Sequence, residues 1–195
     1  MLAEAVPQLV WMAEPDGSIF WYNRNWYDYT GTTSDDMKGW GWQAVHDPEM
    51  LSSVMERWKA SIESGQSFEM EFPLRGKNGE FRWFLTRVNP AHNSDGQIVR
   101  WFGTNTDVDV QRRLDQRNRF ILGLDESVRA LESPEEITLT LARLLGEHLG
   151  ADRCAYAEVE ADEDHFFIPG DYTRDGVETI VGNMQCRNSG LKFFA

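Results

Sequence analysis

Apolar and polar residues alternate along residues 67–109, and this period of two predicts three consecutive strands. The first strand places apolar side chains at Phe68, Met70, Phe72 and Leu74. Turns at Asn78-Gly79 and Asp95-Gly96 separate it from strands over residues 81–88 and 98–106. The second strand has aromatic residues on both faces, so we expect both faces of the sheet to be covered.

The preceding residues predict a hairpin and several helices. Short apolar runs over 9–13 and 19–22 flank Asp16-Gly17, a common hairpin turn. Thr33 followed by Asp36 resembles a weak helix cap, so one or two brief helices are expected over residues 23–42. A longer helix is predicted with Asp47 as its cap, Pro48 at its start, Gly65 at its end, and an apolar stripe of Leu51, Val54, Met55, Trp58 and Ile62.

From Asp107 the apolar spacing becomes that of a heptad repeat. The repeat positions hold Val110, Leu114, Ile121, Leu124, Val128 and Leu131, and only Arg117 interrupts them. Three heptads are the lower limit for a coiled coil. Two interpretations stay open: a helix that pairs with a second copy in a dimeric coiled coil, and an amphipathic helix packed on its own domain.

A further helix is predicted after Ser133-Pro134-Glu135-Glu136, in which Ser133 caps and Pro134 fits the first turn. Gly150 ends this helix. Residues 154–159 alternate like a strand, residues 166–168 suggest another, and no clear pattern follows Gly182.

Composition and charge narrow the classes of function. The chain has 195 residues, enough for one or two domains, and a net charge of −13. This charge disfavours contact with nucleic acid or with an anionic membrane surface. Cys154 and Cys186 lack metal-like spacing and fit a reducing compartment. Residues 1–10 do not resemble a signal peptide and no apolar run is long enough for a membrane span, so we expect a cytoplasmic protein.

Several motifs together resemble a PAS domain over about residues 3–110. They are Leu9-Val10-Trp11, Asp16-Gly17, Asn23, Trp26, Tyr29-Thr30-Gly31, Trp42, Val45-His46-Asp47-Pro48, Arg82-Trp83-Phe84 and Trp101 to Asp107. The last two resemble the PAS-associated C-terminal motif of the subgroup common in bacterial sensor histidine kinases. Residues 120–180, with Leu145 to Arg153 and Asp171-Tyr172, resemble the beginning of a GAF domain.

The resemblance implies an α+β fold, a five-stranded antiparallel sheet with short helices over one face. We therefore expect a PAS sensory domain over residues 1–109, a signalling helix over 110–132, and a truncated GAF-like α/β segment over 133–195, which is short for a domain. The resemblance also places a ligand-binding cup beneath the helices, although a shared fold does not specify the ligand.

Strand alternation points seven side chains toward this cup: Phe72, Leu74, Phe84, Thr86, Val88, Trp101 and Asn105. One interpretation is a small, mostly apolar ligand cavity in which Thr86 and Asn105 orient the ligand. The alternative is that the seven side chains simply fill the core.

Haem and photochemical flavin are disfavoured as cofactors, and the cofactor is otherwise unknown. The long helix has no histidine, and His46 is more simply a loop residue with local hydrogen bonds than a haem ligand. Photochemical flavin binding needs a cysteine near Gly39 to Trp42, where the chain has none. Of the positions that match flavin-reading amides in relatives, Leu74 and Phe84 are apolar and only Asn105 is an amide.

No catalytic site is predicted, because the chain lacks phosphate-cradling and kinase-type glycine motifs. No metal site is predicted either, since the two cysteines lack metal-like spacing. The expected function is sensory input to a two-component histidine kinase. Asp107, Val108 and Asp109 would relay ligand or partner binding into the linker helix, and partners would be a second copy and a downstream kinase domain. The alternatives are a PAS interaction module without ligand, the input region of a cyclic-dinucleotide enzyme, and a non-functional gene fragment.

Overall fold

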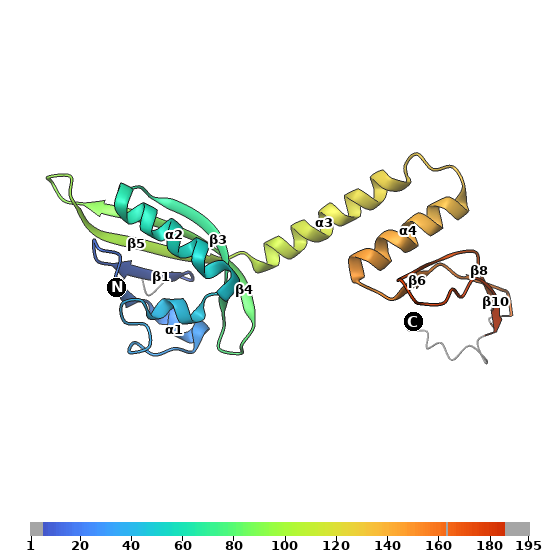
Figure 1. Ribbon diagram of the computed structural model, residues 1–195, viewed down its shortest axis with the longest axis horizontal. Helices are drawn as coiled ribbons and strands as arrows, with labels where there is room; N and C mark the ends of the chain where they lie inside the picture. Colours follow the sequence, from blue (N-terminus) through green and yellow to red (C-terminus); the bar gives the residue numbers. More distant parts are fainter. Residues whose placement is uncertain (1–5, 163, 186–195) are drawn as a thin grey trace. The chain divides into compact units, whose positions relative to one another are not determined.

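The computed structural model describes residues 6–162 and 164–185, and its chain divides into two compact units between Asp115 and Gln116. The first unit is built on a five-stranded sheet in the order β2-β1-β5-β4-β3, with antiparallel neighbours throughout (Figure 1). The strands are β1 (Leu9–Ala13), β2 (Ile19–Tyr22), β3 (Phe68–Arg75), β4 (Phe81–His92) and β5 (Ile98–Asp107). The predicted α+β fold with a five-stranded antiparallel sheet is confirmed.

The strand boundaries differ from the predicted ones mainly at β4. This strand continues to His92 instead of ending at Val88, because β5 offers partners along its whole length, down to a pairing of His92 with Ile98. The predicted turns at Asp16-Gly17, Asn78-Gly79 and Asp95-Gly96 all join antiparallel neighbours. Each turn places its glycine at a positive φ.

Three helical elements follow the hairpin. Helix α1 (Arg24–Thr30) begins where the Asn23 side chain accepts a hydrogen bond from the amide of Trp26. The 3-10 helix η2 (Gly41–Val45) leads into α2 (Pro48–Ser64), which Asp47 caps and Gly65 ends as predicted.

The weak capping signal at Thr33 and Asp36 starts no helix. The two residues do bond reciprocally, since the Thr33 amide donates to Asp36 and the Asp36 amide donates to the Thr33 hydroxyl. They enclose only a turn, because the chain then buries Met37 and pairs Gly39 with Ile19 in an isolated β-bridge. At Gly39 the backbone also takes a φ of 62°, in the left-handed region, which is incompatible with a continuing right-handed helix.

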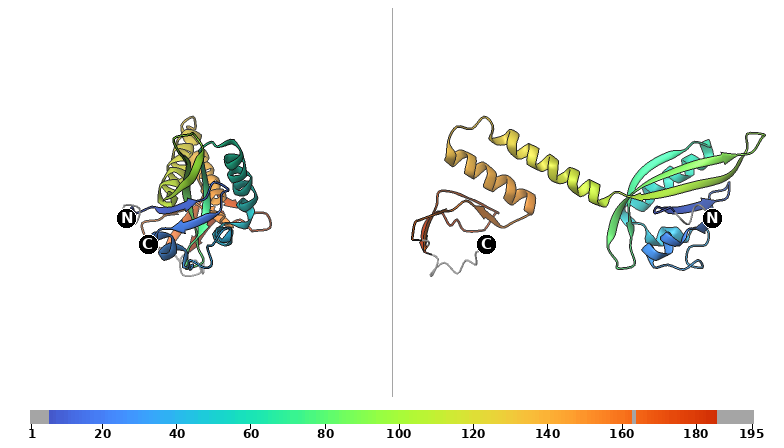
Figure 2. Two further views of the ribbon diagram at one scale, coloured as in Figure 1. Left: turned by 90° about the vertical axis from the view of Figure 1, so that its left-hand side faces the viewer. Right: turned by 180° about the vertical axis from the view of Figure 1, so that it is seen from behind.

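The core of the first unit lies between one face of the sheet and these helices. Figure 1 shows α2 in front of the strands, and the right panel of Figure 2 shows the strands in front of α2. Aromatic rings dominate the contact: Trp58 of α2 packs edge-on against Trp11 of β1 at 5.7 Å and against Trp101 of β5 at 5.3 Å. Such pairs bury large apolar areas and fix their mutual orientation.

Helix α3 (Asp109–Val128) follows β5 and ends near the predicted limit of the linker. The second unit also contains α4 (Pro134–Leu149), capped by Ser133 and ended by Gly150 as predicted. Helix α4 packs on β6 (Arg153–Ala155) and β9 (Asp171–Thr173), which form one small sheet. A second small sheet contains β7 (Glu158–Val159), β8 (His165–Ile168) and β10 (Gly182–Gln185).

The single strand predicted over residues 154–159 is wrong. Residues 156 and 157 lie outside any strand, and the chain leaves one sheet and enters the other there, because β6 pairs with β9 whereas β7 pairs with β8. Cys186 lies outside the described residues. Among the described helices, none is long and apolar enough to cross a membrane.

Exposure varies along the predicted heptad seam. Val110, Leu114 and Ile121 are exposed by 60%, 47% and 48%, whereas Leu124, Val128 and Leu131 are half-buried. In the second unit, Phe120 stacks on His148 of α4 at 3.6 Å. The first part of the seam therefore keeps an apolar face that the described residues leave exposed.

We predict that Gly103→Ala destabilises the first unit. Trp11 and Gly103 are cross-strand partners, and a methyl group on Gly103 would lie 2.0 Å from Cε2 of the buried Trp11 ring. Overpacking of this kind costs about 1–3 kcal/mol, so the midpoint of urea unfolding should fall. Gly123→Ala is the control: nothing lies within 4 Å of the added methyl, and alanine favours a helix over glycine, so this change should not lower the midpoint. An unchanged midpoint for Gly103→Ala would show that the Trp11 ring can move aside freely.

Candidate functional site

A small cavity lies between the sheet and the helices of the first unit. Its volume is about 30 Å³, and it is lined by Trp11, Ile19, Trp26, Trp42, His46, Val54, Trp58, Phe68, Phe72, Thr86 and Asn105. This volume matches the share of one water molecule in the liquid. Pockets for drug-sized ligands occupy roughly 300–1,000 Å³, so the cup is nearly filled by its own side chains in this conformation.

A buried hydrogen-bond network fixes the floor of the cavity. The indole Nε1 of Trp11 donates to Oδ1 of Asn105 at 2.9 Å, and Nδ2 of Asn105 donates to the Thr86 hydroxyl at 2.7 Å. An indole nitrogen can only donate, which sets the orientation of the Asn105 amide. Asn105 and Thr86 face each other across β5 and β4, so their side chains hold each other in place.

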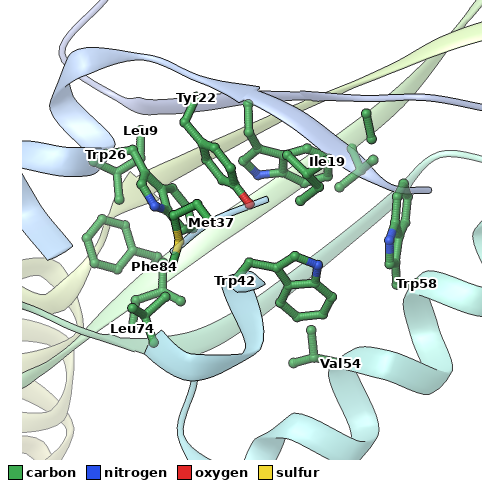
Figure 3. Packing of buried hydrophobic residues seen from close by; sticks show 14 of the residues in the cluster. Leu9, Ile19, Tyr22, Trp26, Met37, Trp42, Val54, Trp58, Leu74 and Phe84 are labelled. Carbon is green, nitrogen blue, oxygen red and sulfur yellow. The ribbon is translucent and has the colours of Figure 1, made fainter. Parts of the chain in front are cut away.

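In the core of this unit, three further buried donors have no hydrogen-bond partner among the described residues: Nε1 of Trp26, Nε1 of Trp42 and the hydroxyl of Tyr22. All three residues are at most 4% exposed, and burial raises the pKa of Tyr22. Figure 3 shows these side chains projecting from α1, η2 and β2 into the same interior. An unpaired buried donor costs about 1–3 kcal/mol of stability. A hydrogen-bond acceptor that reached these donors would therefore stabilise the folded domain.

His46 forms part of the cavity wall and is neutral at physiological pH. Its Nδ1 lies 2.9 Å from the carbonyl oxygen of Trp42, which can only accept, so Nδ1 carries the proton. The ring packs between Trp42 and Phe72, each with its ring centroid 4.8 Å away. Burial lowers the pKa of His46 to about 4, and the bond to the Trp42 carbonyl offsets this only in part.

The seven side chains predicted to face the cup are all buried, but only three of them reach the cavity. Phe72, Thr86 and Asn105 line it, whereas the other four belong to the surrounding core: Leu74, Phe84, Val88 and Trp101. Their role in binding a ligand stays a prediction. Most of the cavity wall comes from residues that strand alternation could not single out, among them Trp26, Trp42 and Trp58. The high tryptophan count was the available signal, since large aromatic residues dominate the core they enter.

The residues present do not fit the polar edge of a flavin. Leu74 and Phe84 are buried apolar side chains at two of the positions where flavin-binding relatives carry amides. The third position, Asn105, already uses both ends of its amide within the protein. Haem does not fit the space that His46 borders, because the cavity is only about 30 Å³ and the imidazole is packed between the rings of Trp42 and Phe72.

Comparison with known proteins identifies the first unit. The sequence model of a family described as the PAS fold matches residues 15–105. Residues 15–105 form a PAS domain. A solved structure of an RNA-binding light-oxygen-voltage receptor shares the fold, with a TM-score of 0.53 and 18% identity over 66% of this chain and 37% of that one.

Two curated relatives extend the comparison. The uncharacterised protein y4lL of Sinorhizobium fredii is 32% identical over 113 residues, which cover 58% of this chain and 14% of that protein. The peroxide stress-activated histidine kinase mak1 of Schizosaccharomyces pombe is 28% identical over 135 residues, which cover 67% of this chain and 8% of the kinase. The chain thus spans a small part of the length of these relatives.

The exit from the PAS domain is held by a cluster of polar contacts around the predicted relay residues. Asp107 pairs with Arg82 of β4 at 3.0 Å and accepts from the amide of Asp109 at 3.0 Å. The Val108 amide donates to the carbonyl of Trp83 at 2.9 Å. The structure therefore joins all three predicted relay residues to β4 or to the start of α3; their role in signalling stays a prediction.

Sequence reasoning missed Arg112, which attaches the first turns of α3 to the sheet. Its guanidinium lies over the Trp83 ring, 3.9 Å from the centroid, and pairs with Glu71 of β3. Asp109 is 6% exposed, accepts from the Trp83 amide at 3.4 Å and pairs with Arg113 at 2.9 Å. Cation–π contacts of this kind contribute roughly 0.5–2 kcal/mol.

We predict that His46 makes the PAS domain less stable in acid. The unfolded chain protonates His46 near the ordinary pKa of 6.5 and the folded chain only near 4, so between these values the unfolded state binds more protons. The free energy of unfolding should fall by roughly 3 kcal/mol from pH 6.5 to pH 4 through this group. Tryptophan fluorescence in urea measures it, because all eight tryptophans lie in residues 11–101.

His46→Gln is the comparison for that measurement, because carboxyl groups also titrate in this range. The variant should lose the His46 part of the pH dependence and keep the remainder. Parallel curves for the wild type and the variant would contradict the burial of a neutral imidazole.

We predict that Arg112→Gln loosens the start of α3. Loss of the contacts with Trp83 and Glu71 should speed amide hydrogen exchange in residues 112–116, the first amides that are bonded within the helix, by about threefold to tenfold. Arg119→Gln is the control, because Arg119 is an exposed arginine further along the same helix. Equal exchange in the two variants would mean that Arg112 does not hold the helix.

Proposed function

We propose that this chain is the sensory input region of a two-component sensor histidine kinase. Its PAS domain would detect a small ligand or a partner, and α3 would carry the response toward a kinase domain. The similarity to the Schizosaccharomyces pombe histidine kinase supports this output, although the matched residues cover only 8% of that protein. In this proposal the PAS domain of the chain senses the signal and α3 relays it.

The observation that carries the proposal is the course of β5. This strand holds Asn105, in the cavity wall, and Asp107, in the contacts at the helix start, two residues apart. Side chains two residues apart lie on the same face of a strand. A shift of Asn105 would therefore move Asp107 and the first turn of α3, where Asp109 and Arg112 are held by the sheet. Two near-equal packings of this junction would give a switch.

The small cavity favours a second candidate function. With only about 30 Å³ of space, the cup can be interpreted as a filled core, and the PAS domain would then serve interactions between proteins. The two functions differ in one respect. A sensor must open its cup to admit a ligand, whereas an interaction module keeps the cup closed.

We also infer that residues 133–195 are the start of a GAF-like segment. The sequence motifs of that resemblance are supported by α4 lying on β6 and β9, as an α/β segment would place them. In the same arrangement, residues 110–132 would be the signalling helix between two sensory segments.

We predict that the chain forms a dimer through α3. The exposed apolar residues Val110, Leu114 and Ile121 fall on one heptad seam, and pairing with a second copy would bury them. Ending the chain before Val110 should leave a folded PAS domain that dimerises at least about tenfold more weakly, as measured by analytical ultracentrifugation. Dimerisation unchanged by this truncation would count against the linker helix as the interface.

Two lysine variants of the full chain make the test specific. Leu114→Lys places a charge on the seam, whereas Leu122→Lys places one on a residue that is 63% exposed and off the seam. Only the first should weaken the dimer. Equal weakening by both variants would point to a general loss of helix packing.

A further inference from the structure

Two hydrogen-bond donors in the wall of the cavity have no partner among the described residues. Nε1 of Trp26 and Nε1 of Trp42 are both buried without a partner, although both residues line the cavity. The other two indoles of the wall are satisfied, since Trp11 donates to Asn105 and Trp58 donates to the carbonyl of Gly17 at 3.3 Å. The cavity thus offers two N–H groups that need an acceptor.

The wall of the cavity carries no charge. None of the lining residues is Asp, Glu, Lys or Arg, and His46 is held neutral by its burial. An anion or a cation entering here would lose its hydration without meeting a counter-ion, which is strongly unfavourable. The remaining surface is aliphatic and aromatic, so it suits an apolar body.

We infer that the PAS cavity selects an uncharged, compact, mostly apolar ligand that carries a hydrogen-bond acceptor such as a carbonyl oxygen. The acceptor would take the indole N–H of Trp42 or Trp26, and the apolar body would pack among Ile19, Val54 and Phe72. This inference rests on the proposed sensing function, since it names the class of ligand for that same cup.

Room for such a ligand must come from a change in the wall. Trp42 lies on η2, a five-residue 3-10 helix whose hydrogen-bond geometry is weaker than that of an α-helix. Met37, a buried member of the same hydrophobic core, has an unbranched side chain that adapts to changes in shape. Movement of η2 would enlarge the cavity while leaving the Trp11, Asn105 and Thr86 network intact.

The test uses two probes of the same shape on the full chain. Cyclopentanone carries a carbonyl oxygen, and methylenecyclopentane replaces that oxygen with a CH₂ group that accepts no hydrogen bond. Binding is followed in ¹H–¹⁵N spectra of the eight indole groups. Cyclopentanone should move the N–H signals of Trp26 or Trp42 downfield, as expected for a new hydrogen bond, and should move the signal of Trp21, which does not line the cavity, little.

Trp42→Phe and Trp26→Phe then isolate the donors. At least one variant should bind cyclopentanone about tenfold more weakly, whereas methylenecyclopentane should change less than about twofold. Trp21→Phe is the control, since it removes a half-buried indole of β2 that does not line the cavity. The shifts measured on the wild-type chain keep the test decisive if a variant fails to fold.

The outcomes separate this inference from the proposed function. If both probes bind and lose affinity equally in the variants, or if cyclopentanecarboxylate binds more tightly than cyclopentanone, the inference is overturned but the cup remains a ligand site. If neither probe binds the wild-type chain, the inference is overturned and the filled-cup function is favoured. A weaker dimer for Leu114→Lys would still support the relay through α3 in either case.

Discussion

The packing of tryptophan rings against a sheet that must also satisfy their N–H groups is the constraint on which this structure depends. The indole N–H of Trp11 donates to the side chain of Asn105, and that of Trp58 donates to the carbonyl of Gly17. The indole N–H groups of Trp26 and Trp42 have no partner among the described residues, and both residues line the small cavity in the core of the domain. Large rings bring much apolar area into a core, but each indole also brings a polar edge that is costly to bury alone. In this domain the indoles without a hydrogen-bond partner are the ones that line the candidate site.

The same strand that carries the amide partner of Trp11 also leads out of the domain. Asn105 and Asp107 share a face of β5, and α3 starts two residues later at Asp109. Asp107 pairs with Arg82 and accepts from the Asp109 amide, and Arg112 lies over the Trp83 ring. Individual contacts at a partly exposed junction contribute little each. Together they attach the helix to three neighbouring strands, which makes its orientation dependent on the sheet.

Much of the fold could be predicted from the residues, and the reasons are local. Alternation around Phe72 and Leu74, the glycine turns, and the Asp47 and Gly65 caps each specify structure within a few residues. The site could be predicted less well. Asn105 and Thr86 follow from strand alternation. Trp26 and Trp42 enter the cavity from short helical elements, which have no clear periodicity in the sequence. Arg112 meets Trp83 only because the tertiary fold brings α3 against β4. The break between Cys154 and Val159 depends on pairing with distant strands, which the sequence pattern does not contain.

One further consequence concerns how this domain can vary among related sequences. The Trp11 ring occupies the space where a side chain at position 103 would stand, so the two positions share a single volume. A larger residue at 103 becomes acceptable only alongside a smaller one at 11, and that smaller residue would also leave Asn105 without its indole donor. Positions 11, 103 and 105 should therefore change as a group, and a homologue that differs at one of them should differ at the others.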